Sequence, residues 1–223
     1  MSYRYRASPS ASKGWYPVPL VRKPTQPPGH SQPGSAEVLA GLGSVSAEER
    51  WAAARAAGAL PDSAAALAAA LPRETDSRVR EAMFTGLVRI GTRDSIAQLL
   101  PMLRSDDSAL RGGALDALRS SPVAAHEFLP QLLRDPDADV RILSCELARN
   151  LPGEEASRAL CALLAHEHEV NVCAAAIEVL AEVGDQAALP ALEHCAQRFP
   201  QVPYLGFAIK LATDRITAAG NRG

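Results

Sequence analysis

The chain has 223 residues, of which 47% are hydrophobic and only 4% are aromatic, and alanine and leucine supply most of the apolar content. These two residues favour helices, whereas strands prefer β-branched and aromatic residues, so the composition argues against a β-rich fold. A net charge of −2 argues against a protein that binds nucleic acid over its whole surface.

The sequence also bears on location. No stretch approaches the roughly 18 continuous apolar residues of a membrane-spanning helix. The N-terminus lacks the apolar segment of a secretory signal. We therefore expect no membrane insertion, a cytoplasmic location and four cysteines present as free thiols.

Residues 1–45 differ in composition from the rest. They hold seven of the 17 prolines and five basic residues against one acidic residue, whereas the remainder holds 18 basic and 24 acidic residues. Because proline favours extended backbone, we predict an extended, basic arm. Arginine and aromatic side chains are enriched at interfaces, so we expect the arm to bind a partner through six residues: Tyr3, Arg4, Tyr5, Arg6, Trp15 and Tyr16. The alternative is that the arm packs on the chain's own acidic part.

From residue 46 a unit of about 31 residues repeats along the chain. Four full copies cover 78–107, 109–138, 139–169 and 170–200, and a degenerate copy (48–72) and a half copy (202–216) flank them. Equivalent apolar positions are spaced by 31, 30 and 32 residues: Val79, Leu110, Val140 and Val172. A fixed period of this length is typical of stacked helical repeats.

Each unit is predicted to form two antiparallel helices, because its apolar residues recur at helical spacing. Breaks between the helices are expected at Gly91, Pro122, Gly153 and Gly184, and caps of the second helices at Asp62–Ser63, Asp94–Ser95 and Asp185. The second helices carry a Leu-Pro pair at 100–101, 129–130 and 189–190. The predicted fold is all-α: a right-handed α-solenoid of about five helical hairpins over 46–217, with the extended N-terminal arm before it and a flexible C-terminus at 218–223.

The segment LPQLLRDPDADVRILSCELA, with VLAEVGDQAALPAL further on, resembles the HEAT repeat. The short period is similar to the HEAT-like repeats associated with phycobilisome lyases. This resemblance covers roughly residues 46–217 and implies a solenoid with a long binding surface. It does not imply one function, because this repeat serves many.

Arginines recur directly after the equivalent apolar position, at Arg80, Arg111 and Arg141, and Arg50 aligns with them. Aspartates precede them at Asp76, Asp107 and Asp137. We predict an Asp–Arg ladder that fixes the stacking of the repeats. The alternative is a stripe of arginines that binds anions.

Possible metal ligands gather between residues 161 and 195: Cys161, His166, His168, Cys173, His194 and Cys195. Zinc or iron accepts such ligands. Their spacing matches no known metal motif, so we interpret them as core thiols and solvated histidines, and we predict no cofactor.

Three enzyme classes with related folds are weighed against this interpretation. Pairs such as His126–Glu127 are similar to those of deoxyhypusine hydroxylase, a di-iron enzyme built from HEAT repeats, but in that family they follow the first-helix valine, where this chain has Arg80. Bilin lyases share the scaffold, although no residue here is matched to a tetrapyrrole. DNA glycosylases of the HEAT-like type need a basic concave surface, and the repeats here are acidic.

We therefore predict a non-catalytic scaffold for protein–protein interaction: an accessory subunit, adaptor or assembly factor. Its partner is another protein or a multi-subunit complex, not nucleic acid. The alternative is a chromophore- or cofactor-handling protein of the bilin-lyase type, or a metal-binding enzyme that uses the 161–195 cluster.

Overall fold

A computed structural model describes residues 34–121 and 123–220, which fall into one compact unit. Every regular element in these residues is helical, and they contain no strand. The helices are α1 (Ser35–Gly41), α2 (Ala47–Ala57), α3 (Ala64–Ala70), α4 (Ser77–Ile90), α5 (Arg93–Ala97), α6 (Ser108–Arg119), α7 (Leu129–Leu132), α8 (Ala138–Cys145), α9 (Gly153–Leu164), α10 (Val170–Val183), α11 (Leu189–Arg198) and α12 (Pro203–Gly220).

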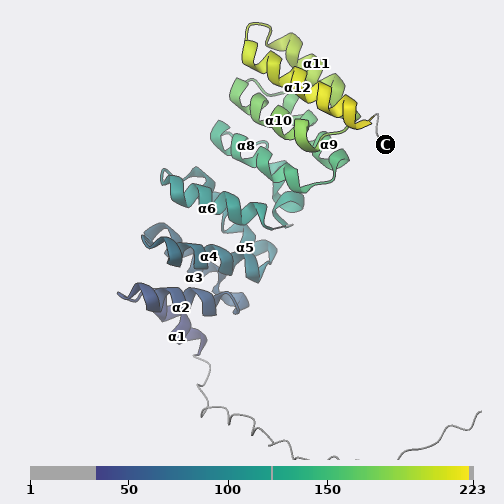
Figure 1. Ribbon diagram of the computed structural model, residues 1–223. Coiled ribbons are helices and arrows are strands. Elements are labelled where there is room, and N and C mark those ends of the chain that lie inside the picture. The colour runs from purple at the N-terminus through teal and green to yellow at the C-terminus, as the bar shows by residue number, and fades with distance from the viewer. Residues whose placement is uncertain (1–33, 122, 221–223) are drawn as a thin grey trace, which may run out of the picture. The chain divides into compact units, whose positions relative to one another are not determined.

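The helices stack in two layers (Figure 1). One layer, here called layer A, consists of α2, α4, α6, α8, α10 and α12, and the other, layer B, of α3, α5, α7, α9 and α11. Neighbouring members contact each other, as in α2 with α4, α10 with α12, and α9 with α11. The described residues thus form five hairpins, from α2–α3 to α10–α11, between the single helices α1 and α12. The predicted all-α solenoid is confirmed.

The core runs between the two layers. The equivalent positions Val79, Leu110, Val140 and Val172 are all buried, as the repeat predicts. Leucines from layer B face them and are fully buried too: Leu67, Leu99, Leu132 and Leu160. Since no single hairpin can cover its own apolar face, each repeat depends on its neighbours for burial.

The second helix of most hairpins is broken in two at its proline. Short 3-10 or π segments accompany α3, α5, α7 and α11: η2 (Leu71–Arg73), η3 (Leu100–Arg104), η4 (Ala124–Phe128) and η6 (Gln186–Ala188). Pro72, Pro101, Pro130 and Pro190 each stand in the first turn of the second piece. Proline has no N–H to donate, so it is tolerated where a helix restarts and not within one.

Helices end or begin at three of the predicted breaks, Gly91, Gly153 and Gly184, and Pro122 lies outside the described residues, but only one of these glycines is left-handed. Gly91 ends α4 in the left-handed conformation at φ 65°. Gly184, in contrast, is extended (φ −68°, ψ 159°), and Gly153 begins α9. A side chain at Gly153 would place its Cβ 2.8 Å from the Val183 carbonyl oxygen, so this glycine permits a close approach to α10.

The predicted caps also need correction. Asp185 does cap its segment, since its side chain accepts the Ala187 N–H. Thr92, not Asp94–Ser95, caps α5 by accepting the Ser95 N–H at 3.1 Å. Ser63 caps nothing, because its hydroxyl donates to the carbonyls of Ala57 and Leu60.

The predicted boundaries of the helical part also shift. Helix α1 lies inside the stretch predicted as an extended arm, and it packs on α2. Helix α12 continues to Gly220, into the predicted flexible terminus. The array therefore begins at Ser35 and not at residue 46. Tyr3, Arg4, Tyr5, Arg6, Trp15 and Tyr16 lie outside the described residues.

Candidate functional site

The four recurring arginines make the same local contact. Each guanidinium donates to the backbone carbonyl six residues earlier, as Arg50 does to Ser44 at 3.0 Å and Arg141 to Asp135 at 2.7 Å. Arg80 and Arg111 repeat the contact. This hydrogen bond ties the first turn of each layer A helix to the turn before it.

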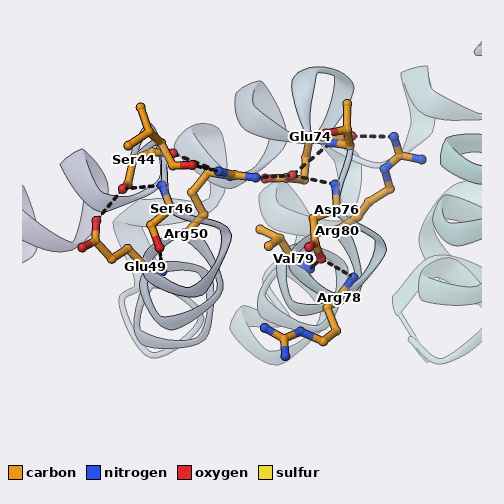
Figure 2. Close-up of polar contacts among 11 residues, drawn as sticks. Ser44, Ser46, Glu49, Arg50, Glu74, Asp76, Arg78, Val79 and Arg80 are labelled. Carbon is orange, nitrogen blue, oxygen red and sulfur yellow. Dashed lines mark hydrogen bonds and ion pairs between the residues drawn. The ribbon is translucent and has the colours of Figure 1, made fainter.

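Three of these arginines also reach an acidic residue in the next repeat. Arg50 binds Glu74 through two hydrogen bonds of 2.7 and 2.9 Å, which Figure 2 shows between neighbouring helices. Arg141 binds Glu167 in the same way, at 2.7 and 3.0 Å. Arg80 lies 3.1 Å from Asp107. These ion pairs link successive repeats, so the arginines are held by the fold.

Of the three predicted aspartates, Asp107 does pair with a ladder arginine, whereas Asp76 and Asp137 do not. Asp76 and Asp137 are N-caps: their side chains accept backbone N–H groups at the starts of α4 and α8. Asp107 caps α6 and also meets Arg80. Glu74 and Glu167, which the sequence analysis did not single out, are the main ladder partners. Asp76 is engaged with its own helix, and Glu74, two residues before it, reaches Arg50 of the preceding repeat.

The buried glutamates are held as carboxylates. The Arg50 hydrogen bond lowers the pKa of Glu74, against the opposing effect of burial. Burial would raise the pKa of Glu167, but hydrogen bonds from Arg141 and from the backbone of Glu169 and His168 outweigh it and lower the pKa. Both side chains are thus ionised members of buried pairs.

The cysteines and histidines between 161 and 195 do not form one site. Cys173 and Cys195 are buried in the core, whereas His166, His168 and His194 are exposed. The neighbouring Cys195 thiol and burial raise the pKa of Cys173, and burial raises the pKa of Cys161. Within residues 34–121 and 123–220, no three His, Cys, Asp or Glu side chains are grouped to hold a metal ion.

A cleft of about 760 Å³ opens on layer B between α7 and α9, and we call it the α7–α9 cleft. Its floor is apolar, formed by Leu129, Leu133, Leu151, Ala159 and Leu163. Its rim carries charged and imidazole groups: His126, Arg134, Glu155, Arg158, His166, His168 and Glu169. The Arg141–Glu167 pair closes one end. An apolar floor with a polar rim is the usual form of a recognition site.

A second cleft of about 550 Å³ occupies the corresponding place between α1 and α3, beside the Arg50–Glu74 pair. Its layer B wall consists of three alanines and the exposed Arg73: Ala66, Ala69, Ala70 and Arg73. Five residues before the ladder glutamate, Ala69 corresponds to Ala162 in the α7–α9 cleft, and by the same count Ala65 corresponds to Arg158. The repeat geometry therefore produces both clefts, and the side chains of α7 and α9 determine which polar groups line the α7–α9 cleft.

Several polar groups of the α7–α9 cleft are free to bind a partner. Among the described residues, the side chains of Arg134, His166 and His168 make no hydrogen bond or ion pair. His126 lies 3.7 Å from Glu155 across the cleft. The sequence analysis singled out the histidines as possible metal ligands or members of His-Glu pairs. It missed Arg134, Glu155 and Arg158, which could have been found because they belong to the second helices of consecutive repeats.

Comparison with known proteins identifies the repeat. The family described as HEAT repeats matches residues 35–119 and 126–201, which confirms the predicted resemblance. No curated protein matches the chain. None of the described helices is both long and apolar enough to cross a membrane.

Among solved structures, three crystal structures of engineered proteins are similar to this chain. Their sequence identities are 20%, 18% and 22%, and their TM-scores are 0.38, 0.39 and 0.38. The alignments cover 82%, 83% and 82% of this chain, and 96%, 99% and 58% of the engineered chains, in the same order.

Proposed function

The chain belongs to the family of HEAT repeat proteins, and on that premise we propose that it is a non-catalytic interaction scaffold that binds a segment of a partner protein in the α7–α9 cleft. In this role it serves in the cytoplasm as an accessory subunit, adaptor or assembly factor. The partner is a protein or a multi-subunit complex, not a nucleic acid.

The observation that carries the proposal is the difference between two equivalent hollows. Both clefts arise from the same repeat geometry, and each has an apolar lining and one arginine without an ion pair among the described residues, Arg73 or Arg134. Only the α7–α9 cleft adds histidine side chains, together with Glu155 and Arg158. A partner segment that inserts one or more apolar side chains and presents a carboxylate to the unpaired Arg134 satisfies both features. Stacking alone does not require these rim residues.

The N-terminal arm is proposed as a second attachment point, through Tyr3, Arg4, Tyr5, Arg6, Trp15 and Tyr16. Two linked contacts raise the overall affinity through effective concentration, although each is weak alone.

Site-specific photocrosslinking tests the cleft. A photoreactive amino acid at Ala162 places the probe in the α7–α9 cleft, and the same residue at Ala69 places it at the matched position of the α1–α3 cleft. We expect a discrete crosslinked partner in the native cell from Ala162 and none from Ala69. Equal crosslinking from both positions, or none from Ala162, contradicts the proposal.

The arm is tested in the same assay. Removal of residues 1–33 leaves every described helix in place, because α1 begins at Ser35. We expect a lower crosslinking yield at Ala162 with unchanged helical circular dichroism. An unchanged yield would refute the role of the arm and leave the role of the cleft standing.

A further inference from the structure

A third hollow, of about 650 Å³, lies on the opposite layer between α2 and α4, and we call it the tryptophan groove. Trp51 and Arg55 come from α2, and Arg78, Glu81 and Arg89 come from α4. Gly58, Ala82 and Gly86 line the groove between these side chains, at the place where the backbones of α2 and α4 meet. From Arg78 to Arg89 the stripe on α4 spans about 16 Å, the length of about five extended residues.

Two of the arginines stack on the ring of Trp51. The guanidinium carbon of Arg55 lies 4.8 Å from the Trp51 ring centroid, and that of Arg78 lies 5.5 Å from it. A guanidinium stacked on an aromatic face keeps the N–H groups of its edge available for a carboxylate. The stacking also limits the rotamers of two long exposed side chains, which lowers the entropy lost on binding.

The charge of the groove is unbalanced, in contrast with the ladder. Arg78 pairs with Glu48 at 2.7 Å, and this pair is well exposed. Within the described part of the chain, Arg55 and Arg89 have no acidic partner, and Glu81 is the one acidic residue of the lining. Arg50 and Arg141, by comparison, are saturated by buried glutamates. Buried ion pairs therefore account for Arg50 and Arg141, whereas Arg55 and Arg89 of the groove have no carboxylate partner among the described residues.

We propose that the tryptophan groove binds an acidic peptide segment of a partner protein. Its carboxylates lie against Arg55 and Arg89, and an apolar side chain of the segment rests in the small-residue centre beside Trp51. A nucleic acid would need a longer basic track, and the chain beyond residue 45 carries 24 acidic against 18 basic residues. This site lies on the layer opposite the α7–α9 cleft, so a scaffold with both could hold two segments at once.

Tryptophan fluorescence of the full chain tests the proposal. The chain has two tryptophans, and a Trp15→Phe background leaves Trp51 as the only one. The probes are a synthetic peptide of about six residues that alternates glutamate with leucine, the same peptide with glutamine for glutamate, and a short single-stranded oligonucleotide. We expect a saturable change of Trp51 emission with the acidic peptide alone, and weaker binding at higher salt.

Matched arginine variants locate the contact. Arg55→Gln and Arg89→Gln should each weaken binding of the acidic peptide about fivefold. Arg73→Gln, an exposed arginine on the other layer, should leave it unchanged. Unaltered melting curves and unaltered crosslinking at Ala162 would show that the variants fold and that the cleft is independent. No saturable change, equal binding of the glutamine peptide, tighter binding of the oligonucleotide, or equal loss in Arg73→Gln would overturn the proposal.

Discussion

The ladder glutamates show how one side chain joins local and long-range structure. The Glu74 carboxylate accepts the N–H groups of Thr75 and Asp76, at 2.9 and 2.8 Å, and also binds Arg50 of the preceding repeat. Glu167 repeats this with His168, Glu169 and Arg141. A carboxylate with this many donors is both buried and ionised, so it fixes the turn and the neighbouring repeat together.

Substitution of Glu74 tests this role. Glu74→Gln leaves the partly exposed guanidinium of Arg50 without its counter-charge, and we expect a loss of about 1–2 kcal/mol of stability at neutral pH. Glu154→Gln is the matched control, because Glu154 forms an exposed pair with Arg158 and should cost less than about 0.5 kcal/mol. Urea unfolding measures both, and equal small losses would contradict the importance of the buried pair.

The pH dependence of stability follows from the lowered pKa of Glu74. The stabilisation is fully present above the ordinary glutamate pKa, about 4.3, and is lost as the pH falls through the lower value of the folded state. We expect the melting temperature to fall below about pH 4 in the unmodified chain and to fall less steeply in Glu74→Gln. Parallel curves would count against an ionised Glu74 in the folded state.

At the scale of the helix, close approach between layer A helices depends on glycine. A Cβ at Gly58 would lie 2.8 Å from the Gly86 Cα, so α2 and α4 touch backbone to backbone there. Nothing lies within 4 Å of a Cβ at Gly112 in α6. Glycine therefore allows α2 and α4 to pack closely, whereas in α6 Gly112 makes no such contact and only lowers the stability of the helix.

Alanine at the two positions should act in opposite directions. Gly112→Ala removes the flexibility of glycine from a helix interior and should add up to about 1 kcal/mol of stability. Gly58→Ala forces α2 away from α4 and should cost about 1–3 kcal/mol. Thermal melting of both variants decides the matter, and a shift in the same direction would contradict the tight packing of α2 on α4.

At the scale of the molecule, α12 is the last described helix of the stack, and it lacks the large apolar side chains with which α10 packs on its neighbour. The Tyr204 hydroxyl donates to Asn171, which sets α12 beside α10 with an offset of 33 residues. In α10, Cys173, Ile177 and Leu180 are fully buried. The residues at the same offset in α12 are Gly206, Lys210 and Thr213, none of them buried. These three positions are therefore less apolar than their counterparts in α10, as expected at an end repeat, although Tyr204, Phe207 and Leu211 of α12 are also exposed.

Restoring the apolar pattern at this end should cause association. In a Lys210→Ile, Thr213→Leu variant, α12 would present the face that α10 buries, and we expect concentration-dependent oligomers by sedimentation velocity. Asp116→Leu adds an exposed leucine in the middle of the stack and serves as the control. If the two variants sediment alike, Lys210 and Thr213 are not what prevents association at this end.

By itself, the sequence determined the repeat and its helices. Three features can be seen in the local sequence: the period of about 31 residues, the proline of the second helix, and the apolar position shared by Val79, Leu110, Val140 and Val172. The structure contains all three, because they depend on hydrogen bonding and burial within one repeat. The Asp185 cap and the left-handed Gly91 were predictable for the same reason.

Only the tertiary structure decided which charged residues form ion pairs and which cleft is lined by polar groups that could bind a partner. The sequence predicted Asp76 as a partner of the arginines, but this aspartate caps its own helix and Glu74 reaches the preceding repeat. The α7–α9 cleft likewise joins residues from His126 to Glu169 that have no common spacing. The distances between charged groups of different repeats depend on how the repeats stack. An aspartate at a helix start can cap its own helix, bind an arginine of another repeat, or do both, so the local sequence pattern does not determine either outcome.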